Sequence, residues 1–141
     1  ADVPVFVHGH AAWAEGVGES LTPINPEEPW YLVINPNCQI ATKEIFLAQD
    51  LTRDTFPITI REFVAGRSQN VCEPVVRRLY PKVGQAIDWL AQYGKARLTG
   101  TGACIFAAFE TQNAAKTILE QLPNQWQGFV VQGKNISPAL K

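Results

Sequence analysis

Runs of apolar residues and alternating polar positions predict several short strands. Residues 30–34 (WYLVI) are almost entirely apolar, which is typical of a strand in the centre of a sheet. Three further short runs, at residues 96–98, 105–109 and 128–131, are bounded by turn residues and predict strands as well. Near the N-terminus, residues 9–21 predict two strands joined by a glycine-rich bend.

Helical periodicity is clearest between Pro81 and Gly94. Apolar side chains recur there at the spacing of one helix face, at Val83, Ala86, Ile87, Leu90 and Tyr93. Pro81 suits the first turn of a helix, and Gly94 is expected to end it in the left-handed conformation. A second amphipathic helix is predicted between Thr111, as its N-cap, and Pro123, as its stop.

Two shorter helices are predicted after the first central strand. Thr42 is interpreted as the cap of a helical turn that reaches Phe46, and the plain interpretation of Phe46 is core packing. Asn70 and Glu73 have the spacing of a capping box, which predicts a helix running to Tyr80. These helices and strands favour an α+β fold, an antiparallel sheet with helices packed on one face.

Composition and charge narrow the classes of function. The chain has 141 residues, about one domain, and a net charge of −1 without a basic block. Neither nucleic acid nor a membrane surface is therefore an expected partner. No apolar run reaches transmembrane length, and no signal peptide is recognised. Because the chain begins at Ala1 and contains no Met, we expect it to be a piece of a longer protein.

The cysteines and histidines predict no metal site. Cys38, Cys72 and Cys104 are odd in number and form no CxxC pair, which argues against a disulfide framework. This usage favours a reducing, cytoplasmic compartment. His8 and His10 have a spacing that could ligate a metal, but no acidic or Cys cluster joins them. Cys104 is expected to be a small buried side chain rather than a nucleophile.

The most informative run lies between two predicted strands and consists of Gly100, Thr101, Gly102 and Ala103. Glycine allows positive φ, and successive free N–H groups in such a turn form a concavity that suits a phosphate. The dinucleotide fingerprint is excluded, because it requires a third glycine and a following helix, whereas Ile105 opens a strand. The alternative is a tight connection in which glycine serves the geometry alone.

Asp2 is a second candidate for a functional residue. It precedes Val3 and Pro4, a pattern typical of a helix N-cap followed by proline in the first turn. The functional interpretation is a carboxylate held at the mouth of a site, and the local pattern leaves both interpretations open.

Several segments, taken together and in order, resemble one known family. They are residues 2–7 (DVPVFV), 9–12 (GHAA), 14–19 (AEGVGE) and 98–104 (LTGTGAC), supported by 70–78, Trp89 and 135–138. The chain resembles the C-terminal half of the diphosphocytidyl-methylerythritol kinases. These enzymes belong to the GHMP kinase superfamily, together with galactokinase, homoserine kinase and mevalonate kinase.

This resemblance implies a domain organisation. Residues 1–22 would form the end of the N-terminal kinase domain, residues 23–29 a connector, and residues 30–141 the ferredoxin-like C-terminal domain of GHMP kinases. The family has an Asp where Val71 stands, so the start of the following helix is expected to be held differently here.

The resemblance also implies roles for candidate residues. Asp2 would accept or orient the proton of the substrate hydroxyl, as suits phosphoryl transfer. Thr42 and Phe46 would bind the cytidyl end of the substrate, with the ring of Phe46 stacked on cytosine. The loop would lie next to the transferred phosphoryl group, through Gly100, Thr101, Gly102 and Ala103.

The implied reaction requires parts that this sequence lacks. ATP and Mg²⁺ would be held largely by an N-terminal half that carries the phosphate-binding loop and the catalytic Lys, so this chain alone is expected to be inactive. The implied function is phosphorylation of the 2-hydroxyl of the cytidyl diphosphate-linked methylerythritol in non-mevalonate isoprenoid biosynthesis. The alternatives are a GHMP-type kinase of another small alcohol, and an α+β binding module without chemistry.

Overall fold

A computed structural model of the chain describes residues 11–15, 20–24, 27–51, 70–100 and 102–136. Its main body is a four-stranded antiparallel sheet with the strand order β4-β5-β3-β6. The strands are β3 (Trp30–Asn35), β4 (Arg97–Leu98), β5 (Ile105–Phe109) and β6 (Gln127–Gln132). The predicted strands are confirmed, and the apolar run at residues 30–34 is a central strand as expected.

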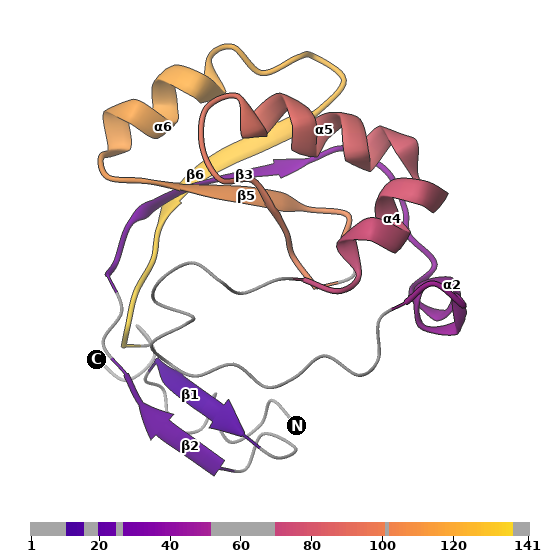
Figure 1. Cartoon of the computed structure of the whole chain (residues 1–141). Helices are drawn as coiled ribbons and strands as arrows, with labels where there is room; N and C mark the ends of the chain where they lie inside the picture. The colour runs from indigo at the N-terminus through magenta and orange to yellow at the C-terminus, as the bar shows by residue number, and fades with distance from the viewer. Residues whose placement is uncertain (1–10, 16–19, 25–26, 52–69, 101, 137–141) are drawn as a thin grey trace.

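Helices cover one face of this sheet, as Figure 1 shows for α4, α5 and α6. These helices are α4 (Glu73–Leu79), α5 (Pro81–Ala91) and α6 (Gln112–Leu119), and a short helix, α2 (Thr42–Leu47), lies at the side. The chain order strand, helices, strand, strand, helix, strand and the sheet order together give the ferredoxin-like topology. The predicted α+β class with helices on one face is therefore confirmed.

The core lies between the sheet and the helices. Leu32 and Ile34 of β3 are fully buried and face Ile105 and Ala107 of the neighbouring strand. The predicted stripe of α5 supplies four buried side chains, Val83, Ala86, Ile87 and Leu90. On the opposite face of the sheet, Tyr31 packs edge-on against the ring of Phe106, with centroids 5.8 Å apart. This alternation between faces is the period of two that strands require.

The predicted termini of α5 and α6 are partly confirmed. Pro81 begins α5, and the hydroxyl oxygen of Thr111 caps α6 by accepting a hydrogen bond from the Ala114 N–H at 3.1 Å. Gly94, however, does not adopt a positive φ, so its predicted role as a left-handed terminator is wrong. A Cβ at this position would stand 3.5 Å from Cζ of Phe109, an ordinary packing distance, so Gly94 lies against a side chain of β5 without a close approach that requires glycine.

Two predicted caps are wrong. Thr42 is the first residue of α2 rather than its cap, because Ala41 holds the N-cap position and makes no side-chain bond there. The capping box at Asn70 also fails, since α4 begins at Glu73 with Cys72 at the N-cap position. Asn70 instead forms a turn before the helix, in which its Oδ1 accepts from the Cys72 N–H at 2.9 Å. Val71 packs partly buried against the core.

A separate antiparallel hairpin is formed by β1 (Ala12–Glu15) and β2 (Ser20–Pro23), which confirms the two predicted N-terminal strands. Figure 1 shows it apart from the four-stranded sheet, on the side away from α5 and α6. The N–H of Ala11 donates to the carbonyl of Asn135 at 2.6 Å, and the Asn135 N–H donates to Glu28 Oε2 at 2.7 Å. The first bond fastens the hairpin to the segment that follows β6, and the second ties that segment to the residues that precede β3.

Candidate functional site

The Gly loop, defined as residues 100–103, joins β4 to β5. Backbone and side chain of Thr99 both close its base, since the N–H and the Oγ1 each donate to the carbonyl of Cys104 at 3.0 Å. The N–H of Gly102 turns back and donates to the carbonyl of Thr99 at 2.7 Å. The loop is therefore a tight turn with a fixed base. Thr101 lies outside the described residues.

Both glycines of this loop adopt positive φ, +49° at Gly100 and +95° at Gly102. At Gly100 a Cβ would meet nothing within 4 Å, so glycine is required there for conformation only. At Gly102 a Cβ would stand 2.6 Å from Cδ1 of Ile40 and 3.0 Å from Cδ1 of Leu98. Gly102 is therefore required for both its φ and the close approach of two apolar side chains.

The loop leaves backbone donors for a ligand. The N–H of Gly102 is used inside the turn, whereas those of Gly100 and Ala103 make no hydrogen bond within the described part of the chain. Successive free N–H groups in a turn form a concavity that binds anions, and here the two unused donors are separated in the sequence by the bonded Gly102 N–H. The geometry of the described loop residues thus fits the phosphate interpretation as well as the purely structural one.

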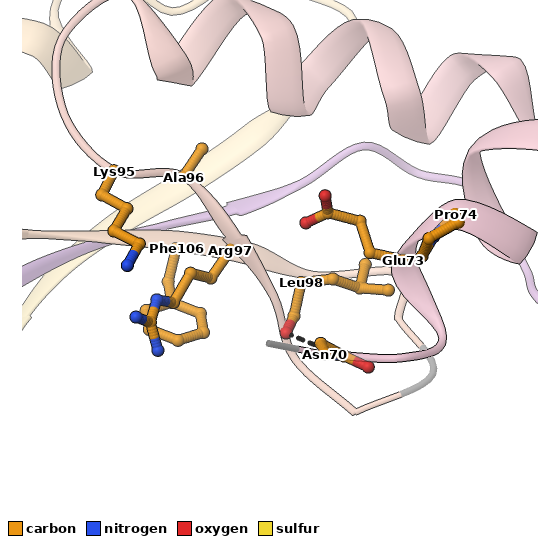
Figure 2. Close-up of a pocket in the computed structure, with 8 residues that line it drawn as sticks. All are labelled: Asn70, Glu73, Pro74, Lys95, Ala96, Arg97, Leu98 and Phe106. Carbon is orange, nitrogen blue, oxygen red and sulfur yellow. Dashed lines mark hydrogen bonds between the residues drawn. The ribbon is translucent and has the colours of Figure 1, made fainter. Parts of the chain in front are cut away.

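Asn70 reaches this loop from the segment before α4, a contact that sequence reasoning missed. Its Nδ2 donates to the carbonyls of Leu98 at 3.0 Å and Gly100 at 2.6 Å. Figure 2 shows the side chain directed at the backbone where β4 ends. The spacing to Glu73 suggested a helix cap, and no local signal in the sequence indicates a partner about thirty residues away.

A hollow of about 430 Å³ lies beside the Asn70 contact. Its described lining residues are Asn70, Glu73, Pro74, Lys95, Ala96, Arg97, Leu98 and Phe106. Arg97 and Phe106 are register partners in adjacent strands, and Figure 2 shows the guanidinium beside the ring. Lys95 and Arg97 give this side of the hollow a positive charge, while Glu73 on the other side forms an ion pair with Arg77 at 3.5 Å.

The short helix α2 carries the two predicted substrate-binding residues. Phe46 is 52% exposed, so the alternative interpretation of this ring as core packing is wrong. Ile45 is fully buried and anchors the helix, while Thr42 lies exposed in its first turn. The approach of Ile40 to Gly102 brings the segment that leads into α2 against the Gly loop.

Tyr80 holds the start of α2 against the α4–α5 junction. Its hydroxyl accepts from the Ala41 N–H at 3.1 Å and donates to Glu44 Oε2 at 2.8 Å. After α2, the guanidinium of Arg78 forms two hydrogen bonds with Asp50, at 2.7 and 2.6 Å. These hydrogen bonds lower the pKa of Asp50 and raise that of Arg78. α2 is thus tied to α4 at both of its ends.

The predicted catalytic residue Asp2 lies outside the described residues, as do His8 and His10. In the ranges that the structure does describe, no group of three His, Cys, Asp or Glu side chains is gathered in a way that could hold a metal ion. Among the same residues, no helix combines the length and the apolar character needed to cross a bilayer. The three cysteines are free thiols.

Comparison with known proteins links the fold and the loop to one family. The family described as "GHMP kinases C terminal" matches residues 57–128, about half of the chain. Proteins named 4-diphosphocytidyl-2-C-methyl-D-erythritol kinase are 56% identical over 140 residues in Nitrosococcus oceani and 58% over 144 residues in Marinobacter nauticus. These alignments cover 99% and 100% of this chain and 50% of each relative. The chain thus spans about half the length of the curated relatives it matches.

Solved structures show the same fold. A crystal structure of 4-(cytidine 5'-diphospho)-2C-methyl-D-erythritol kinase aligns with a TM-score of 0.75 at 23% identity, over 95% of this chain and 54% of that chain. Homoserine kinase from Cytophaga hutchinsonii aligns with a TM-score of 0.57 at 16% identity, over 83% and 46%. At such identities these neighbours establish the fold alone.

Proposed function

The chain belongs to the GHMP kinase family, and from this premise we propose that it is the C-terminal part of a 4-diphosphocytidyl-2-C-methyl-D-erythritol kinase. The observation that carries the proposal is identity above 50% to proteins of that name over nearly the whole chain. The proposed reaction is the ATP-dependent phosphorylation of the 2-hydroxyl of 4-diphosphocytidyl-2-C-methyl-D-erythritol. It belongs to isoprenoid biosynthesis by the non-mevalonate route.

In the proposed reaction the substrate hydroxyl oxygen forms a bond to the γ-phosphorus of ATP. The bond from that phosphorus to the bridging oxygen breaks, ADP leaves, and the hydroxyl proton passes to the carboxylate of Asp2. Phosphoryl transfer of this kind is accelerated mainly by positioning and by stabilising charge on the phosphoryl oxygens. The loop N–H groups of Gly100 and Ala103 are donors of the required type, because neither is used within the described chain.

We assign the cytidyl end of the substrate to α2. The exposed ring of Phe46 offers a flat surface for stacking on cytosine, and Thr42, one helical turn earlier, offers a hydroxyl. The buried side chain of Ile45 and the Tyr80 hydrogen bonds fix the helix that presents them. A fixed platform reduces the entropy lost when the substrate is ordered.

We assign ATP and Mg²⁺ largely to an N-terminal half of the enzyme, because the chain covers only 50% of each of the relatives that are named as the kinase. When bound, Mg²⁺ neutralises charge on the phosphate oxygens. Residues 1–22 would then complete the N-terminal kinase domain, residues 23–29 would connect the domains, and residues 30–141 would form the C-terminal domain. The free thiols favour the cytoplasm as the compartment.

The test uses the full-length kinase that carries this sequence. Phe46→Ala should raise the KM for the cytidyl substrate by about 5- to 150-fold, because stacking on a base contributes about 1–3 kcal/mol. The KM for ATP should change by less than about twofold. Leu47→Ala is the matched control, since Leu47 is 68% exposed on the same helix. Equal effects on both substrates, or turnover of another alcohol with unchanged kinetics, would count against the cytidyl assignment.

Asp2→Asn tests the chemical step in the same enzyme. Loss of a general base typically lowers the rate about 10²- to 10⁴-fold. We therefore expect kcat to fall by that range with little change in either KM. An Asp2→Asn enzyme with full kcat would contradict the role of Asp2, and an unmodified enzyme without phosphotransfer would contradict the proposed function.

A further inference from the structure

We propose that Asn70 is a positioning residue that sets the conformation of the Gly loop for phosphoryl transfer. The inference rests on the proposed function. Asn70 lies in the turn before α4, and its side chain spans from that turn to the end of β4. We call its hydrogen bonds to Leu98, Gly100 and Cys72 the Asn70 bridge.

The Asn70 bridge uses every part of the side-chain amide. The amide nitrogen carries two N–H donors, which meet the carbonyl oxygens of Leu98 at 3.0 Å and Gly100 at 2.6 Å. The amide oxygen accepts from the Cys72 N–H at 2.9 Å. A rotated amide would set oxygen against two carbonyl oxygens, so only one orientation of Asn70 fits.

These bonds hold the entry side of the loop, in addition to the hydrogen bonds of Thr99. The exit side is held by Cys104, which accepts from Thr99, and by the internal bond from Gly102 to Thr99. On the entry side, Asn70 holds the carbonyl of Leu98, the residue before Thr99, and the carbonyl of Gly100, the residue after it. The Gly100 N–H lies in the peptide plane between these two carbonyls, and the carbonyl of that same plane, from Thr99, accepts from the Gly102 N–H at 2.7 Å. Because Asn70 holds the planes on both sides, it restricts the direction of the Gly100 N–H.

The support behind Asn70 is rigid. The backbone carbonyl of Asn70 accepts from the Glu73 N–H at 3.1 Å, and α4 follows with Val75 and Val76 fully buried. A loop that is fixed before the substrate arrives needs no reorganisation in the transition state. Misplacing donors by about 1 Å can cost about 100-fold in rate, so a residue that touches no substrate can control kcat.

The test compares Asn70→Asp with Asn37→Asp in the full-length kinase. Both changes replace an amide donor by an oxygen of equal size. The amide of Asn37 donates to the carbonyl of Gln125 at 2.9 Å and joins the loops beside β3 and β6, with no described hydrogen bond to the Gly loop. The side chains of Asp and Ser can both accept a hydrogen bond from the N–H of the residue two positions later, here Cys72. Asn70→Asp and Asn70→Ser should therefore keep the turn before α4.

We expect Asn70→Asp to lower kcat about 10- to 100-fold with each KM changed less than about twofold. Asn37→Asp should stay within about twofold of the parent in kcat. A carboxylate facing two carbonyl oxygens has a raised pKa, and its protonated form regains one donor. The kcat of Asn70→Asp relative to the parent should therefore be higher at pH 6 than at pH 9. Asn70→Ser should show the lower kcat without this pH dependence.

If Asn70 has a structural role alone, its variants should have a lower thermal midpoint but the kcat of the parent when kcat is measured well below that midpoint. This outcome would overturn the inference. An independent readout is the ¹⁵N–¹H spectrum, in which the amides of Gly100 and Ala103 should shift in Asn70→Asp and Asn70→Ser but not in Asn37→Asp. Unshifted loop amides would also overturn it. If the unmodified enzyme lacked phosphotransfer, the proposed function would fail, and the spectra would still decide whether Asn70 sets the loop.

Discussion

Replacing Gly102 by Ala should be far more damaging than replacing Gly100 by Ala, although the two glycines lie in one loop. At Gly102 the backbone has a φ of +95°, a region that L-residues avoid, at a cost of about 1–3 kcal/mol. The new Cβ would also stand 2.6 Å from Ile40 Cδ1 and 3.0 Å from Leu98 Cδ1. Overpacking of this kind costs about 1–3 kcal/mol more. Gly102→Ala should therefore lower the free energy of unfolding by about 2–6 kcal/mol.

Gly100→Ala incurs only the cost of the positive φ, and this cost is smaller than at Gly102. A φ of +49° is within the left-handed region, and a Cβ there would meet nothing within 4 Å. We expect a loss of about 1–2 kcal/mol. Equilibrium urea unfolding of the chain and its two variants measures both values under one set of conditions. Ile40→Val should recover part of the loss when combined with Gly102→Ala, because it removes the Cδ1 methyl that clashes.

Equal losses for the two glycine variants would refute this reasoning. The reasoning would also be refuted if the free-energy changes of Ile40→Val and Gly102→Ala were additive in the double variant, since residues in contact should show non-additive effects. A loss of less than about 1 kcal/mol for Gly102→Ala would lie well below the expected range of about 2–6 kcal/mol. It would mean that the loop adopts a backbone conformation other than the one described.

Three further predictions concern caps, pH and activity. Thr111→Ala should lower the free energy of unfolding in urea by about 1 kcal/mol, because the side chain of Thr111 caps α6. Thr111→Ser should be close to neutral, and equal losses for the two variants would contradict the role of the cap. The hydrogen bonds from Arg78 lower the pKa of Asp50 in the folded state, so this pair stabilises the fold at pH values above the unfolded pKa of about 4. The stabilisation is lost as the pH falls through the lower pKa of the folded state. Asp50→Asn should therefore lower the urea midpoint at pH 7 slightly, and its difference from the parent should shrink as the pH falls below about 4. A difference that grew on acidification would contradict this sign. The purified chain alone should transfer no measurable phosphate from ATP to the cytidyl substrate, and turnover by it would show that the proposed N-terminal half is not required for the reaction.

The sequence by itself determined the elements whose signals are local. The spacing of apolar residues in α5, the cap at Thr111 and the apolar run of β3 follow from periodicity and from neighbours within four residues, and all appear in the structure. The sheet with helices on one face follows from their order, because each amphipathic element must bury its apolar side. The Gly loop could also be recognised, since glycine adopts positive φ at a lower cost than other residues.

Tertiary structure decided what each ambiguous residue does. Asn70 fits a helix cap equally well by spacing, but the carbonyls of Leu98 and Gly100, distant in sequence, take its amide. Gly94 packs beside the ring of Phe109 and does not adopt the left-handed conformation, and Phe46 stays exposed while Ile45 occupies the buried position of α2. A hydrogen bond or a packing contact depends on which distant segments the fold brings within a few ångströms, and a local pattern holds no information about that distance.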